Sequence, residues 1–97
     1  MSLEVEKTEN EIIIRPIGEF NHTIQEEFQA AYENESPDLK YVLDMNKVTW
    51  IDSAALGMMV KLQAHTGRQF DTQIINSSPK LRALLSQAHF GDMFLIL

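Results

Sequence analysis

The chain has 97 residues, a formal net charge of −6 and no cysteine, which predicts one domain over residues 1–97 and excludes disulfides and thiolate metal sites. Its eight basic residues are scattered, so nucleic acid and anionic membrane are not expected as direct partners. The longest apolar-rich run, near Ala54 to Leu62, is too short to insert across a bilayer, and no signal-peptide pattern is present, so we expect a cytoplasmic protein.

The first residues predict two strands and a helix. Alternating apolar and acidic residues predict a strand over 3–9, and the apolar run over 12–20 predicts a second one, which Gly18 should end. Pro16 cannot donate to a ladder, so that strand should be bulged or lie at an edge there. The first helix starts near residue 21, where Thr23 with Glu26 fits a capping box and Asn21 is a competing cap.

The middle of the chain predicts a buried strand followed by an apolar helix. Residues 40–45 are a short continuous apolar run, which is typical of a strand buried on both faces. Residues 48–51 form either a strand end or a tight approach to the next element. A helix is expected from about Ser53 to His65, with Gly67 just beyond its end.

The last third predicts a strand, an amphipathic helix and a closing strand or tail. Residues 70–77 have a strand pattern, and Ser78 with Pro79 supplies an N-cap followed by proline at the first helical position. Residues 94–97 end the chain with apolar side chains. Strands that alternate with helices indicate an α/β fold with a mixed, mostly parallel sheet of four to five strands and three to four helices.

Motifs for self-contained catalysis are missing from the sequence. The three histidines, His22, His65 and His89, have no metal-type spacing, and neither phosphate-binding glycine motif is present. Ser53 is not in a G-x-S-x-G elbow, and no pattern nominates a base for it. We therefore expect no metal, no cofactor and no enzymatic activity.

Ser53 stands at the start of the most apolar helix. One interpretation is that Ser53 is a plain N-cap, a role that Asp52 could fill equally well. The residues from Ala54 to Val60 are apolar or small for nearly two turns, whereas a surface helix usually has a polar face. Either this segment is buried all round, or its outer face waits for a partner.

A phosphate on Ser53 would change such a surface sharply. It adds about −1.5 to −2 charge, and the free N–H groups of a helix N-terminus stabilise that anion within the protein. A partner that docks on the apolar turn would have to desolvate it. The position is suited to a binary switch on an interface.

The run YVLDMNKVTWIDSAALGMMVKL resembles the core of STAS-domain proteins, the anti-sigma factor antagonists of bacteria. The matching positions are Asp44, Asp52, Ser53, Leu56 and Gly57. Residues 15–21 resemble the family's early turn at Gly18, Phe20 and Asn21, and residues 75–97 resemble its closing strand, helix and tail.

The resemblance implies helices mainly on one side of the sheet and no catalysis by the domain. It also implies that a GHKL-type serine kinase, often the anti-sigma factor itself, binds the unphosphorylated protein and phosphorylates Ser53, and that a PP2C-type phosphatase resets it. Asn21 stands where many members have aspartate, and Ala54 where many have a second serine. The runner-up is a small STAS subunit that binds the ATPase of a lipid-transporting ABC system; an enzyme ranks third.

The expected partner surface centres on the first turns of the second predicted helix and on the turn before the first. Which of its two methionines faces outward is left open, because the segment lacks a clean polar side. The residues assigned to this switch surface, beside the phosphorylation site Ser53, are Asp52, Ala54, Ala55, Gly57, Met58, Met59, Gly18, Phe20, Asn21 and His22.

Overall fold

The computed structural model describes residues 2–68 and 71–97. Its strands are β1 (Leu3–Lys7), β2 (Glu11–Pro16), β3 (Gly18–Phe20), β4 (Lys40–Asp44), β5 (Val48–Ile51), β6 (Thr72–Ile75) and β7 (Leu95–Ile96). Its helices are α1 (Gln25–Ala30), α2 (Ser53–Thr66) and α3 (Pro79–Gln87), with 3-10 turns at His22–Ile24 and Phe90–Asp92. The order follows the predicted alternation, with the short strand β3 added. Residues 48–51 form the strand β5, which is the first of the two alternatives given for them.

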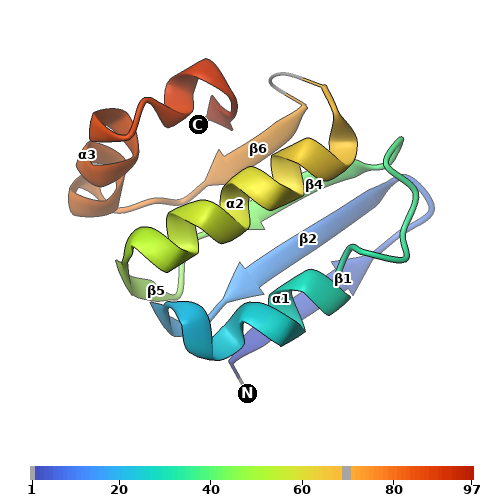
Figure 1. Cartoon of the computed structure of the whole chain (residues 1–97), viewed down its shortest axis with the longest axis horizontal. Helices are drawn as coiled ribbons and strands as arrows, with labels where there is room; N and C mark the ends of the chain where they lie inside the picture. The colour runs from blue at the N-terminus through green and yellow to red at the C-terminus, as the bar shows by residue number, and fades with distance from the viewer. Residues whose placement is uncertain (1, 69–70) are drawn as a thin grey trace.

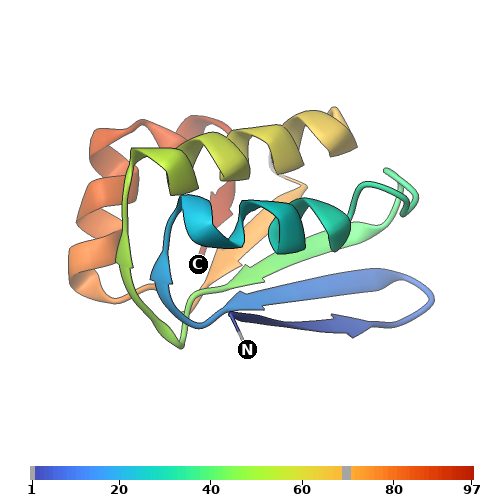
Figure 2. The ribbon, with the colours of Figure 1, turned by 60° about the horizontal axis from the view of Figure 1, so that its bottom comes forward.

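The main sheet is mixed and mostly parallel, as predicted. Its strand order is β1-β2-β4-β6-β7 (Figure 1). The β1–β2 pair is antiparallel and the other pairs are parallel. Both α1 and α2 cover the same face of this sheet (Figure 2), which confirms the one-sided arrangement that the resemblance implied.

The second strand ends at Pro16, slightly before the end predicted at Gly18, and Gly18 instead begins the short strand β3, because the chain changes sheets here. Pro16 ends β2, and Gly18 adopts a φ of 79° that favours glycine. The Gly18 N–H donates to the carbonyl of Lys47 at 2.8 Å, and β3 then pairs with β5 in a separate two-stranded parallel sheet. This small sheet carries the chain to the start of both α1 and α2.

The helix ends show which of the predicted caps form. The Oδ1 of Asn21 accepts from the backbone N–H of Thr23 at 3.0 Å, so the competing cap is the real one and the Thr23 capping box is wrong. Gly67 lies in the left-handed region at the end of α2, and the Ser78 hydroxyl caps α3, as predicted.

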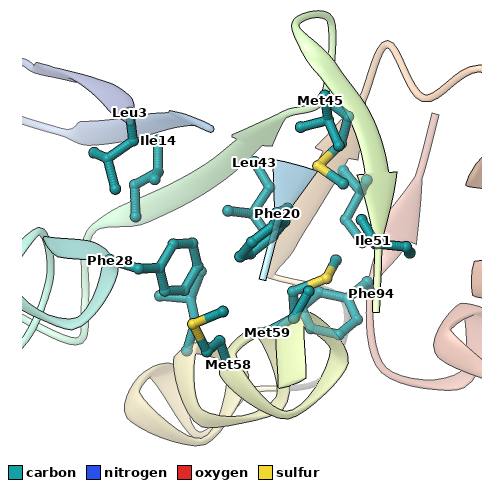
Figure 3. Close-up of a cluster of buried hydrophobic side chains, with 14 of the residues drawn as sticks. Leu3, Ile14, Phe20, Phe28, Leu43, Met45, Ile51, Met58, Met59 and Phe94 are labelled. Atoms are coloured by element: carbon teal, nitrogen blue, oxygen red, sulfur yellow. The ribbon is translucent and has the colours of Figure 1, made fainter. Parts of the chain in front are cut away.

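The core lies between the main sheet and the two helices above it (Figure 3). Apolar side chains of β2 and β4 face Phe28 of α1 and the inward side of α2. Full burial of such a side chain contributes about 1.5–3 kcal/mol. Because the core takes up one whole side of α2, it fixes which residues of that helix remain outside.

A polar network ties together the carboxyl ends of three neighbouring strands. The buried carboxylate of Asp44 accepts from Arg15 Nε at 2.9 Å, from Asn76 Nδ2 at 3.0 Å and from the Asn46 N–H at 3.0 Å. Burial alone would raise the pKa of Asp44, but the hydrogen bonds from Asn76, Arg15 and Asn46 outweigh it and lower that pKa. The network anchors the turn from which β5 starts.

In the described part of the chain, no helix has the length and apolar character needed to cross a membrane.

Candidate partner-binding surface around Ser53

Ser53 is placed at the exposed first position of α2 by the end of β5. Asp52 is extended, with φ −117° and ψ −174°, and its Oδ1 accepts from the Ala55 N–H at 2.9 Å. Asp52 is therefore the N-cap, which excludes the plain-cap interpretation of Ser53. Within residues 2–68 and 71–97, no hydrogen bond engages the Ser53 hydroxyl, so it is free for modification.

The outer face of α2 is exposed and made mostly of small or apolar residues. Ser53, Gly57 and Val60 are exposed, and Ala54 and Leu56 are partly so. Of the two alternatives that the sequence left open, burial all round is therefore wrong. A Cβ built on Gly57 would meet no atom within 4 Å, so packing within this chain does not require a glycine there.

Four residues assigned to the switch surface lie in the core instead. The side chains of Phe20, Met58 and Met59 are buried (Figure 3), and so is that of Ala55. None of the four offers more than an edge to a partner. Positions 55, 58, 59 and 62 form the inward stripe of a helix that packs on a sheet. Neither methionine faces outward, because both fall within that stripe.

The structure does bring the turn before α1 next to the start of α2. Phe20 of β3 pairs with Ile51 of β5, so the chain leaves both strands at the same level, at Asn21 and Asp52. A hollow of about 220 Å³ between the two helices is lined by Gln25, Ala54, Gly57, Met58 and Lys61. Gly18 and Asn21 are partly buried but do not line this hollow, and His22 is exposed.

A second hollow lies on the other side of Ser53, between α2 and α3. It encloses about 410 Å³, and we call it the α2–α3 groove. Its lining residues are Trp50, Ile51, Asp52, Ser53, Leu56, Leu84, Gln87 and Ala88. Apart from Asp52 and Ser53, the sequence reasoning did not assign these residues to the surface, since the groove depends on how α3 packs against α2.

Trp50 is the most conspicuous of the residues that the sequence analysis missed. It is the chain's only tryptophan, and it is 41% exposed. The Lys80 Nζ lies 4.8 Å from its ring centroid. A lone tryptophan two residues before an aspartate-serine pair was the available signal. Large exposed aromatic side chains are frequent at the energetic centre of protein interfaces.

The site has no donor set for a metal. In the described residues, no three side chains of histidine, cysteine, aspartate or glutamate gather closely enough to hold a cation. What the site does offer is a free hydroxyl, a helix N-terminus, the mostly apolar α2–α3 groove and a smaller hollow of mixed lining. This combination suits protein binding that responds to a change of charge.

The capping geometry predicts different costs for two neighbouring substitutions. Asp52→Ala should lower the free energy of unfolding by about 1 kcal/mol, because the Ala55 N–H loses its acceptor. Ser53→Ala should change it by less than about 0.5 kcal/mol, as is usual for an exposed side chain without a partner. Urea unfolding followed by circular dichroism measures both, and a larger cost for Ser53→Ala would contradict the cap assignment.

Comparison with known proteins identifies the family. The STAS domain family model matches residues 2–97. A STAS-domain containing protein of Pseudomonas aeruginosa (strain UCBPP-PA14) is 33% identical over 88 residues, which are 89% of this chain and 87% of the relative.

Solved structures share the fold at low identity. An anti-sigma factor antagonist from Mycobacterium paratuberculosis has a TM-score of 0.80 at 15% identity, over 97% of this chain and 82% of its own. The anti-sigma factor antagonist SpoIIAA in its unphosphorylated form has a TM-score of 0.72 at 17% identity, over 98% and 86%. The Bacillus cell fate determinant SpoIIAA in its phosphorylated form has a TM-score of 0.66 at 18% identity, over 98% of this chain and 90% of its own. With its sequence matched along almost its full length and its fold shared, this chain belongs to the STAS domain family.

Proposed function

We propose that this protein is a phosphoswitch of the anti-sigma factor antagonist type. Its unphosphorylated form binds a GHKL-type serine kinase that serves as anti-sigma factor, and phosphorylation of Ser53 releases it. A PP2C-type phosphatase restores the binding form, and the domain itself catalyses no reaction. The observation that carries the proposal is the free, exposed hydroxyl of Ser53 at the edge of an exposed apolar helix face.

The physical chemistry of the position supports a switch that leaves the fold intact. A phosphate at the first residue of α2 lies against the positive end of the helix dipole, so the folded state tolerates it. A partner that covers the same turn must desolvate about −1.5 to −2 charge, beside the carboxylate of Asp52. Binding therefore weakens much more than folding does. The existence of SpoIIAA in a phosphorylated form also supports the proposal.

Phosphorylation by candidate kinases tests the proposal. Purified GHKL-type serine kinases from the same organism are incubated with the chain and ATP, and the product is analysed by intact mass and phosphopeptide mapping. We expect one phosphate, on Ser53, and none on the Ser53→Ala variant. Modification of Thr49, Ser77 or Ser78 with Ser53 untouched would overturn the proposal; Ser77 is buried, and Ser78 is engaged as the cap of α3.

Gly57→Ala should separate stability from binding. A glycine inside a helix costs roughly 0.5–1 kcal/mol relative to alanine, and open space surrounds the new methyl group. We therefore expect the unfolding temperature to rise while the affinity for the kinase falls, because the added methyl group stands on the exposed face of α2 that the proposal assigns to the partner. Ser86→Ala, on the exposed side of α3, is the matched control and should leave binding unchanged. Unchanged affinity in Gly57→Ala would place the partner elsewhere.

A further inference from the structure

The α2–α3 groove has the size and the apolar lining of a pocket that accommodates one apolar side chain. Its walls are formed by Trp50, Ile51 and Leu56 on one side and by Leu84 and Ala88 of α3 on the other. A volume of about 410 Å³ lies at the small end of the range for ligand pockets. It therefore suits a single anchoring side chain better than a whole helix.

The charges at the rim indicate what accompanies that side chain. Lys80 lies over the ring of Trp50, and it forms no ion pair with any residue in the ranges 2–68 and 71–97. By contrast, Arg15, Lys40 and Lys47 are all paired with carboxylates. Lys61 and Arg82 also form no ion pair with residues 2–68 and 71–97, but neither of them lines this groove or lies over Trp50. In a chain of net charge −6, an unpaired lysine beside an exposed tryptophan favours a carboxylate on the partner.

The state of Asp52 makes a basic group on the partner less favourable than an acidic one at the groove. One of its carboxylate oxygens is used by the Ala55 N–H, and the positive end of the α2 dipole compensates its charge. A basic group of the partner would find Asp52 already partly neutralised and Lys80 repulsive. An acidic group would meet Lys80 without competition.

We propose that the partner inserts an apolar side chain flanked by a carboxylate into the α2–α3 groove, where the carboxylate pairs with Lys80. The inference rests on the proposed function, because it explains how Ser53 controls binding. Ser53 lines the same groove, so a phosphate there adds about −1.5 to −2 charge to the groove that receives the partner. It repels the partner's carboxylate and draws Lys80 toward itself, which sets the direction of the switch.

Capped tripeptides test the chemistry of the groove without the partner. The probes are Glu-Phe-Glu, Lys-Phe-Lys and Glu-Gly-Glu, titrated into the intact chain with Trp50 fluorescence and amide NMR shifts as readouts. Glu-Phe-Glu should bind saturably in the millimolar range and shift Leu56, Leu84 and Ala88. It should bind about threefold tighter than Lys-Phe-Lys, which is the factor that one exposed ion pair typically gives. Glu-Gly-Glu should not saturate.

Three variants and one control, Ala83→Phe, identify the contacts. Ala88→Phe fills the groove and should abolish binding of Glu-Phe-Glu, whereas Ala83→Phe, on the exposed side of α3 outside the groove, should not. Lys80→Gln should remove the preference for the acidic probe. Ser53→Asp should weaken Glu-Phe-Glu and leave Lys-Phe-Lys unchanged or tighter.

The outcomes separate this inference from the proposed function. Phosphorylation at Ser53 with no saturable shift at the groove would overturn the inference alone. A groove that binds Glu-Phe-Glu in a chain that no kinase phosphorylates would overturn the proposed function alone. Tighter binding of Lys-Phe-Lys would overturn the assignment of Lys80 and make Asp52 the partner's contact.

Discussion

Aspartate at position 53 should lower the affinity for the cognate serine kinase by at least about tenfold, or 1.4 kcal/mol, while alanine should leave it nearly unchanged. Ser53→Ala keeps the surface small and uncharged, and it removes no hydrogen bond of α2 because Asp52 caps the helix. Ser53→Asp places a charge where the partner must exclude water. The fold should tolerate that charge at the start of the helix.

Phosphoserine should weaken binding more than aspartate does. The phosphate carries about −1.5 to −2 charge and three acceptor oxygens, against a single charge and less bulk for aspartate. Calorimetric titration of the unmodified, Ser53→Ala, Ser53→Asp and phosphorylated chains against the kinase domain gives the ranking. Alanine should also make binding insensitive to ATP.

Two other rankings would contradict this account. Equal affinity of all four forms would mean that Ser53 is only the first residue of a helix. Tighter binding of the aspartate and phosphorylated forms would mean that the partner recognises the phosphate, and the direction of the switch would be reversed.

The parts of the fold that were predicted correctly depend on local signals. The continuous apolar run over 40–45 indicated a doubly buried strand, and Ser78 followed by Pro79 fixed the start of α3. Gly67 marked the end of α2, because a residue that ends a helix in the left-handed conformation is usually glycine. Each of these is decided by a few adjacent residues, whatever the rest of the chain does.

The parts that were missed depend on tertiary packing. Helix α2 has apolar residues all around its first turns, so no periodicity could say that Met58 and Met59 face inward while Gly57 faces outward. Packing against the sheet under α2 decides which of these residues face inward. The groove beside Trp50 exists only because α3 packs near α2, and no local pattern encodes the distance between them.

Removal of the Asp44 carboxylate should give the largest loss of stability among the polar substitutions considered. Asp44→Ala leaves Arg15 and Asn76 without their shared acceptor. Hydrogen bonds to a buried charge are worth about 1.5–3 kcal/mol, so we expect a loss of about 2–3 kcal/mol. For a domain of this size, that lowers the Tm by roughly 10–20 °C. Glu6→Ala removes one of the two exposed partners of Arg15, the other being Glu4, and should cost about 0–1 kcal/mol.

The same carboxylate predicts how stability depends on pH. The pKa of Asp44 is lowered in the folded state, so its contribution is complete above the unfolded pKa of about 3.9 and is lost as pH falls through the folded value. The Asp44→Asn variant lacks this pH-dependent contribution to stability. Its free energy of unfolding should therefore fall less steeply below about pH 4 than that of the unmodified chain. Urea titrations at a series of pH values measure both slopes. Parallel slopes would show that Asp44 does not hold the end of β4 as a charge. In that case the turn from Asp44 to Val48, and with it the position of Ser53, would depend on Asn76 and the backbone alone.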